Sequence, residues 1–407
     1  MMIATTGGGV FMMLVHKFAC RMPKDEYGVF TTLLQTVAMM SIPAVGLSGV
    51  FAHQAAGAMT PAHERELAGV FRAVLRALFF LWFAAALGIF GFQAMIMQRM
   101  KIANPAALWV TVGVGLMVLW RPVLGGILQG RQNFFWLGNA AVVDGLGRLL
   151  AVMVIVGLLG YHAAGAMVAV LLGMLAVVLV TGWLVRDCLH GAATPMQWRP
   201  WLRRVVPLTL GLGVAQFMLG ADMIFVQNFF SKDQTGFYAA AGTVGRALVY
   251  FTLPVAAVMF PKLARSEATG EKSNALALAL GVTLLAGLGA ALMCTLFPAL
   301  PVRILLNQSF QEIAAPLVPW FAWSMLPLTL ATVLINSLMA QARFAAVPWL
   351  LAVGGGYALT MYWRLGALVN PTEKQFPVVV QTLGIFSLLL LAVCAWFTWG
   401  PPGKAKS

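Results

Sequence analysis

Charged side chains are scarce in this sequence. They make up 9% of the 407 residues, and only 12 are Asp or Glu against 26 Lys and Arg. So low a charged fraction, with 61% hydrophobic residues and a mean hydropathy of +0.88, excludes an ordinary soluble domain. The basic excess does not indicate a nucleic-acid partner, because most of it lies in short loops between apolar runs. The sequence therefore predicts an integral membrane protein.

Cysteine is scarce as well, and the four residues present are scattered singly with no CxxC pair, which argues against disulfides and a metal site. The five histidines fall near span ends or in loops without ligand spacing, and we expect them at the membrane interface. No GxxxxGK[ST] motif is present, so an ATP-driven pump would need another subunit. The longest loops, around 52–72 and 186–204, are short for an extramembrane catalytic platform. We expect no enzyme and no bound cofactor or metal.

Apolar runs long enough to cross a hydrocarbon core of about 30 Å recur along the whole chain. They predict twelve helices, over residues 1–18, 28–51, 73–97, 106–128, 134–158, 163–185, 205–229, 237–260, 275–298, 312–337, 345–363 and 377–398. An even number places both termini on one side of the membrane. The loops on that side carry fourteen Lys and Arg against nine on the other, which predicts cytoplasmic termini.

A repeat divides these helices into two sets of six. PKDEYGVF at 23–30 matches SKDQTGFY at 231–238, and LQGRQNF ending at Phe134 matches LMAQARF ending at Phe344. Two matches at nearly equal offsets indicate a duplication. We expect a six-helix bundle over 1–185, a cytoplasmic linker over 186–204, a second bundle over 205–398 and a tail over 399–407. Because each half has an even number of helices, the bundles should be related by a pseudo-two-fold axis along the membrane normal, with a cleft between them.

Each half has a proline inside its second helix, Pro43 and Pro254. A proline removes a backbone hydrogen bond and kinks a helix. The matched placement suggests that the two prolines are hinges for alternating access. The other interpretation is that the membrane helices tolerate them without a functional role.

Five ionisable residues lie inside predicted spans: Arg121, Asp144, Arg148, Asp222 and Arg246. Each costs about 2.5 to 3.5 kcal/mol at mid-membrane, so such residues pair or face a polar cavity. Asp144 and Arg148 are one helical turn apart and should pair, and Asp222 and Arg246 should meet across neighbouring antiparallel helices.

Two interpretations of these charges remain open. The pairs could serve only to hold helices together. Alternatively, Arg121, Arg148 and Arg246 attract an anionic substrate in a hydrated cavity while Asp144 or Asp222 binds a coupling cation, H⁺ or Na⁺. Three arginines against two aspartates leave a positive surplus, which suits a phosphate-bearing substrate because guanidinium pairs with phosphate through two parallel hydrogen bonds.

The sequence resembles the multidrug/oligosaccharidyl-lipid/polysaccharide exporter superfamily, and within it the Wzx-like polysaccharide or O-antigen flippases. The resemblance rests on RMPKDEYGVFTTLL, on LQGRQNF, and on DMIFVQNFFSKDQTGFYAAAGTVGRALVYFTLPVAAVMFPKLA. It implies two six-helix bundles around a V-shaped cavity that rock to move a polyprenyl-diphosphate-linked glycan across the inner membrane. It also implies that cationic side chains hold the diphosphate or acidic sugars, a role we assign to Arg121, Arg148 and Arg246.

The resemblance further implies partners: the lipid-linked glycan, membrane lipid, and the glycosyltransferases and polymerase of the same pathway. One alternative keeps the fold and makes the protein a cation-coupled multidrug exporter, for which we would expect a cavity rich in acidic residues. A membrane-embedded glycan polymerase or ligase is a third candidate, and the short loops argue against it.

Overall fold

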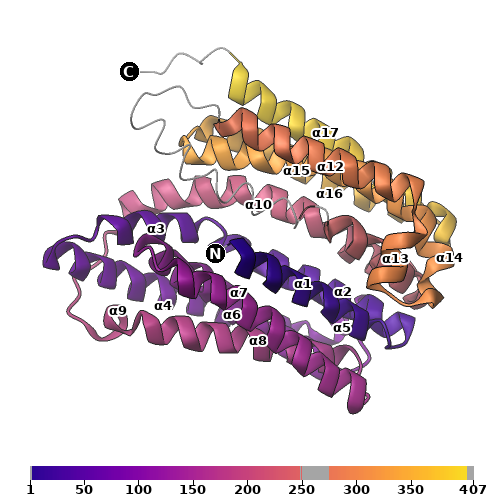
Figure 1. The fold of residues 1–407 in the computed structure, drawn as a ribbon, viewed down its shortest axis with the longest axis horizontal. Coiled ribbons are helices and arrows are strands. Elements are labelled where there is room, and N and C mark those ends of the chain that lie inside the picture. The colour runs from indigo at the N-terminus through magenta and orange to yellow at the C-terminus, as the bar shows by residue number, and fades with distance from the viewer. Residues whose placement is uncertain (1, 248, 250–274, 401–407) are drawn as a thin grey trace.

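A computed structural model describes residues 2–247, 249 and 275–400, and all of the long elements in these residues are helical. Short turns of 3-10 or π helix join or extend several of the helices. A further helix, without a label in Figure 1, covers residues 232–247. The labelled helices are α1 (Met2–Ala19), α2 (Lys24–Met40), α3 (Leu47–Gly57), α4 (Pro61–Gly91), α5 (Gln93–Arg99), α6 (Pro105–Gly130), α7 (Phe134–Val152), α8 (Ala163–Leu184), α9 (Arg186–His190), α10 (Trp198–Phe229), α12 (Ala275–Leu296), α13 (Ala299–Leu305), α14 (Gln311–Ala314), α15 (Val318–Ala340), α16 (Val347–Gly366) and α17 (Phe376–Trp399).

Most of these helices are suited to a membrane. Among the described residues, nine helices are long and apolar enough to cross one, or up to ten if α2 and α3 form one bent span. Helix α1 coincides with the first predicted span, and the 232–247 helix overlaps the eighth. Each of the twelve predicted ranges thus overlaps a helix in the described residues, and residues 250–260 of the eighth range lie outside them. This confirms an all-α, multi-pass membrane protein.

The structure corrects the second predicted helix, 28–51, which is not continuous. Helix α2 ends at Met40, a short 3-10 turn (Ile42–Ala44) follows, and α3 begins at Leu47, with a bend of 41° at the break. Pro43 lies in this turn and supplies the cause, because it has no N–H to continue the helical hydrogen bonds. Its role as a hinge stays a prediction, and Pro254 lies outside the described residues.

The third predicted helix also begins earlier than expected. Helix α4 starts at Pro61 instead of residue 73, because the Thr60 hydroxyl accepts a hydrogen bond from the backbone N–H of His63 and caps the helix. Its 31 residues extend about 46 Å, more than the hydrocarbon thickness, so the polar first turns continue the helix beyond the apolar layer.

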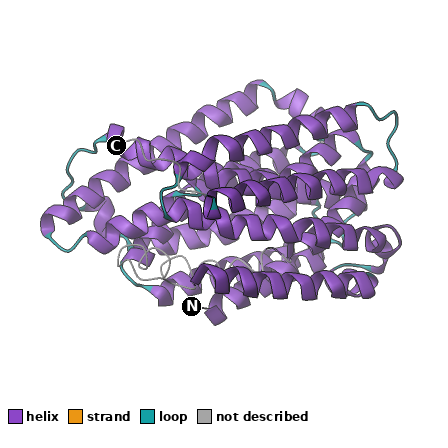
Figure 2. Ribbon diagram, turned by 90° about the horizontal axis from the view of Figure 1, so that it is seen from above, coloured by secondary structure: helices purple, strands orange, loops and turns teal. Residues whose placement is uncertain are grey.

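The helices form two groups with their axes along the length of the molecule (Figures 1 and 2). Helices α1 to α8 lie together, α12 to α17 form the other group, and α10 lies between them, packed on α2 as well as on α15 and α16 (Figure 1). We call these groups the N half and the C half, and α10 and the 232–247 helix belong to the C half by sequence.

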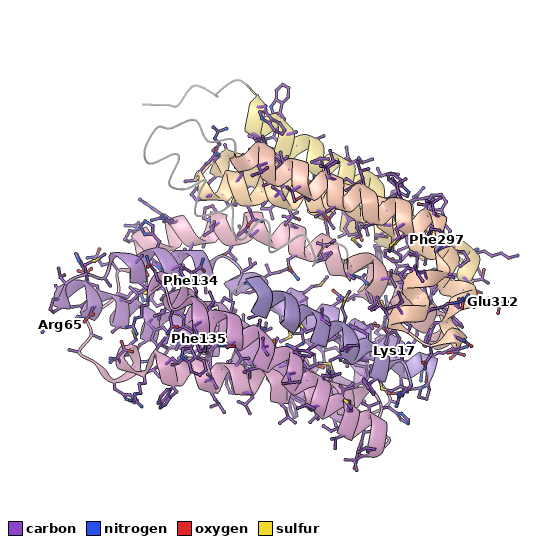
Figure 3. All side chains as sticks on the ribbon, viewed as in Figure 1. Lys17, Arg65, Phe134, Phe135, Phe297 and Glu312 are labelled. Carbon is purple, nitrogen blue, oxygen red and sulfur yellow. The ribbon has the colours of Figure 1, made fainter. Side chains whose placement is uncertain are left out.

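The molecule has two distinct ends, which we name by their loops. The motif end carries residues 20–23, 100–104, 230–231 and 306–310, and the linker end carries residues 131–133, 185–197 and 341–346. Figure 3 labels Lys17 and Glu312 near the motif end and Arg65 at the linker end. Under the orientation predicted from the basic residues, the linker end faces the cytoplasm.

Candidate binding cavity

The N half contains a buried carboxylate held by two arginines. Arg148 Nε donates to Asp144 Oδ1 at 2.6 Å, and its Nη2 donates to Oδ2 at 3.0 Å. Arg121 Nη1, from α6, donates to Asp144 Oδ2 at 2.6 Å. The predicted pair of Asp144 and Arg148 is therefore present, and Arg121 joins it. The three residues, which we call the N-half cluster, carry one net positive charge.

Small residues make room for this cluster among the helices of the N half. A side chain at Gly173 of α8 would place its Cβ 2.6 Å from Cγ of Arg148, so the arginine lies flat between α7 and α8 only because residue 173 is glycine. A Cβ at Gly145 of α7 would lie 2.5 Å from the Gly8 carbonyl oxygen, which lets α1 pack closely against α7. The cluster is thus set into a tightly packed group of helices.

The C half contains a more enclosed pair. Arg246 Nη2 lies 2.6 Å from both carboxylate oxygens of Asp222, and Arg246 Nε donates to the Leu219 carbonyl at 2.9 Å. The Tyr238 hydroxyl donates to Asp222 Oδ2 at 2.8 Å. The second predicted pair is thus present too, and Tyr238 is a partner that the sequence did not indicate. Because the charges of Asp222 and Arg246 cancel, this C-half pair is neutral.

A cavity of about 560 Å³ lies between α1, α2, α6, α7, α8, α10 and the 232–247 helix. All three arginines chosen from the sequence line it, namely Arg121, Arg148 and Arg246. Asp144 and Asp222 do not line it, and both are fully buried behind the arginines. The structure therefore brings the three predicted arginines to one cavity from both halves, with their aspartate partners behind them, and the functional roles of all five stay predictions.

The three arginines differ in how far they reach into this cavity. The Arg121 side chain is 32% exposed, against 10% for Arg148 and 4% for Arg246. Arg121 donates to Asp144 through one terminal nitrogen, whereas Arg148 uses two of its nitrogens on the same carboxylate. Arg121 is consequently the arginine best placed to meet a molecule in the cavity.

Neutral polar residues of the cavity were missed by sequence reasoning. Gln35, Gln216 and Thr243 line it, and the side-chain oxygen of Gln35 is buried with no hydrogen-bond partner among the described residues. His16 lines it as well, with its Nδ1 3.1 Å from the Tyr27 hydroxyl, and its expected place at the membrane interface stays a prediction. These residues could have been found by counting amide, hydroxyl and imidazole groups inside the spans, and not ionised groups alone.

No protein-family model matches the chain, and no curated protein matches it. Solved structures match it over nearly its whole length. An inward-facing multidrug-resistance MATE family transporter of the MOP superfamily superposes with a TM-score of 0.74 at 14% identity, covering 97% of this chain and 93% of that one. The chain has the MATE-type fold.

Two further structures share the MATE-type fold with this chain. The lipid II flippase MurJ, in an inward closed conformation, has a TM-score of 0.69 at 13% identity and covers 96% of this chain and 85% of its own. A MOP superfamily transporter from Pyrococcus furiosus, described as having a binding pocket of reverse polarity, has a TM-score of 0.65 at 13% identity and covers 98% and 91%. The likeness gives the fold, and residue roles in this chain depend on its own cavity.

Proposed function

We propose that the protein is a transporter that moves a polyprenyl-diphosphate-linked oligosaccharide, such as a polysaccharide or O-antigen repeat unit, across the inner membrane by alternating access. The observation that carries the proposal is the N-half cluster, which presents one unneutralised positive charge to a cavity through Arg121. A positive charge in an apolar surrounding is expensive unless something negative joins it. The substrate would supply that negative charge.

Arg121 suits a diphosphate for geometric reasons. A guanidinium has five N–H donors, and only one terminal nitrogen of Arg121 is engaged with Asp144. The free edge can form two parallel hydrogen bonds to phosphate oxygens. Arg148 would act indirectly, because its two bonds to Asp144 hold the carboxylate that orients Arg121.

The rest of the substrate would divide between cavity and lipid. A volume of about 560 Å³ lies within the range of ordinary small-molecule sites, and Gln35, Gln216 and Thr243 offer partners for sugar hydroxyls. The polyprenyl tail would remain in the bilayer between helices. The likeness to a lipid II flippase supports a lipid-linked substrate.

The test compares Arg121→Ala with Arg131→Ala. Arg131 is a matched control, since its side chain is also 32% exposed and also paired with an aspartate, but at the linker end and away from the cavity. Each variant is expressed in cells that lack the wild-type protein. Lipid-linked glycan on the outer face of the membrane is then measured with an impermeant label. We expect loss of outward-facing glycan with Arg121→Ala, partial recovery with Arg121→Lys, and normal export with Arg131→Ala. Normal export by Arg121→Ala at wild-type protein levels would refute the assignment.

A cation-coupled multidrug exporter is the second candidate, supported by the likeness to a multidrug-resistance MATE transporter. Among the described residues that line the cavity are three arginines and no carboxylate, which disfavours a cationic drug. Drug sensitivity in a deletion strain with normal sidedness of lipid-linked glycan would favour this candidate over ours.

The proposal includes a coupling ion and partners. A proton or Na⁺ bound at Asp144 or Asp222 would drive the cycle, and glycosyltransferases and the polymerase of the same pathway would act before and after transport. Flipping measured in vesicles under an imposed proton or Na⁺ gradient tests the coupling. A rate that responds to neither gradient would remove both aspartates from this role.

A further inference from the structure

The two copies of the repeated motif touch each other at the motif end. A Cβ on Gly28 would lie 2.9 Å from the backbone nitrogen of Gly236, and a Cβ on Gly236 would overlap the carbonyl of Lys24. Gly28 and Gly236 occupy equivalent positions in PKDEYGVF and SKDQTGFY. Equivalent positions that touch must lie next to the axis that relates the halves. The backbones approach this closely because both residues lack a side chain.

Two lysines of the N half reinforce this contact by capping helices of the C half. Lys101 Nζ donates to the Gln227 carbonyl at 2.6 Å and to the Phe230 carbonyl, at the end of α10. Lys17 Nζ donates to the carbonyls of Arg303 at 3.1 Å and Leu306 at 2.8 Å, at the end of α13. Both lysines satisfy carbonyls that a helix leaves unpaired, where the helix dipole also favours a cation.

A hydrogen-bonded layer lies between this contact and the cavity. The Tyr27 hydroxyl lies 3.2 Å from the Thr243 hydroxyl and 3.1 Å from His16 Nδ1. His16 and Thr243 line the cavity, whereas Tyr27 is fully buried. The layer therefore closes the motif end of the cavity with side chains from both halves.

We infer that the Gly28–Gly236 contact, with its lysine caps and the Tyr27–Thr243 layer, is the gate that seals the cavity at the motif end and separates when the cavity opens there. The inference rests on the proposed alternating access and is independent of which substrate is carried. These hydrogen bonds can be exchanged for bonds to water, and two glycines interlock no side chains. Such a contact can exist in closed and open forms that differ by little free energy.

The first test measures access of an impermeant thiol reagent to a cysteine placed beneath the gate, Thr243→Cys. Sealed vesicles with the motif end outside are recognised by labelling of a separate Gln308→Cys variant, since Gln308 is exposed at that end. We expect the labelling rate at position 243 to rise about tenfold when Gly236→Ala is added, because its methyl group prevents closure. The matched control is Gly281→Ala in α12, where a Cβ would meet no atom of the described residues within 4 Å. Equal rates in the two glycine variants would show that the contact does not control access.

The second test holds the gate shut in the assembled protein, and it decides the question if Gly236→Ala fails to fold. Lys24 Nζ lies 4.5 Å from the ring centre of Phe237 across the halves, so Lys24→Cys with Phe237→Cys can be joined by a short cleavable bis-maleimide. Thr372→Cys with Gln375→Cys is the matched pair within the C half, because those side chains are 2.7 Å apart and take no part in the gate. Joining 24 to 237 should abolish labelling of Thr243→Cys from the motif end and stop transport, and cleavage should restore both. Joining 372 to 375 should change neither.

The two tests separate the gate from the substrate. Labelling that stays unchanged after 24 and 237 are joined would overturn the gate whatever the substrate is. A different result would support the gate and refute the proposed substrate. In that case labelling would stop when 24 and 237 are joined and return on cleavage, while loss of the protein would leave glycan sidedness unchanged.

Discussion

The two halves of the molecule bury a carboxylate in different ways. Asp144 is shared by two arginines, and one of them, Arg121, remains 32% exposed toward the cavity. Among the described residues, Asp222 is paired with one arginine, Arg246, whose side chain is 4% exposed. The Tyr238 hydroxyl donates a further hydrogen bond to the same carboxylate. The N-half cluster therefore leaves a partly exposed arginine at the cavity, whereas Asp222 and Arg246 neutralise each other. Under the proposed function, the first arrangement binds substrate and the second stabilises the fold.

The internal repeat shows which residues of the two halves are equivalent. The offset between PKDEYGVF and SKDQTGFY places Phe30 at the position of Tyr238, and both rings are fully buried. The same offset places Leu14 at the position of Asp222, so the aspartate and its tyrosine partner occur together in the C half and are both apolar in the N half. A buried carboxylate needs hydrogen-bond donors, so we expect the aspartate and the tyrosine that donates to it to occur in the same half.

Arg246→Ala should have the largest effect on stability. It leaves Asp222 as an uncompensated buried charge, which costs about 3 to 5 kcal/mol in the free energy of unfolding. We expect a marked fall in the apparent melting temperature of the detergent-purified protein. Replacing both partners, Asp222→Leu with Arg246→Met, should recover much of the loss, because no unpaired charge remains. A wild-type melting temperature for Arg246→Ala would show that the C-half pair is not structural.

Arg148→Ala should destabilise less, because Arg121 still neutralises Asp144. The lost hydrogen bonds to a charged group are worth about 2 kcal/mol in the free energy of unfolding. Arg121→Ala should cost less again, since its side chain is partly solvated, while its effect on transport is the greater. Arg148→Ala should thus show the larger fall in melting temperature, and Arg121→Ala the larger loss of outward-facing glycan. Measuring both properties for the two variants tests this. If both properties fall in parallel, the N-half cluster is structural like the C-half pair.

The sequence predicted the positions of the helices and both ion pairs, because apolar length and the spacing of charges are local properties. It predicted a kink at Pro43, but it did not predict the break between α2 and α3 with its 41° bend. It also did not predict that α4 begins at Pro61, because that start depends on the cap from Thr60 and not on apolar length. It also treated Arg121, Arg148 and Arg246 as equals. Their exposure differs because of packing from helices distant in sequence, such as the contact of Gly173 with Arg148.

Tyr238→Phe isolates the hydrogen bond that distinguishes the C-half pair. It removes only the hydroxyl that donates to Asp222 Oδ2, and the ring keeps its packing against Phe321 and Phe376. We expect a loss of about 1 kcal/mol in the free energy of unfolding, typical of a polar contact between membrane helices. The matched variant is Phe30→Tyr, which adds a hydroxyl at the equivalent place without an aspartate and should not stabilise the protein. A stabilising Phe30→Tyr would show that the repeat positions do not differ as described.

Asp187→Asn gives the smallest effect and extends the comparison to a pair outside the membrane spans. Arg131 donates both terminal nitrogens to Asp187, and this hydrogen bonding lowers the pKa of the Asp187 carboxyl below its ordinary value of 3.8. Because the folded pKa is the lower one, the pair stabilises the protein above about pH 4 and the contribution disappears as the pH falls through the folded value. The Asp187 side chain is 56% exposed, so solvent screening limits the contribution to about 0.5 kcal/mol. Melting temperatures of wild type and Asp187→Asn should therefore differ slightly at pH 7 and converge toward pH 3. A difference that persists at pH 3 would mean that packing of the linker, and not its charge, holds α9 against α6.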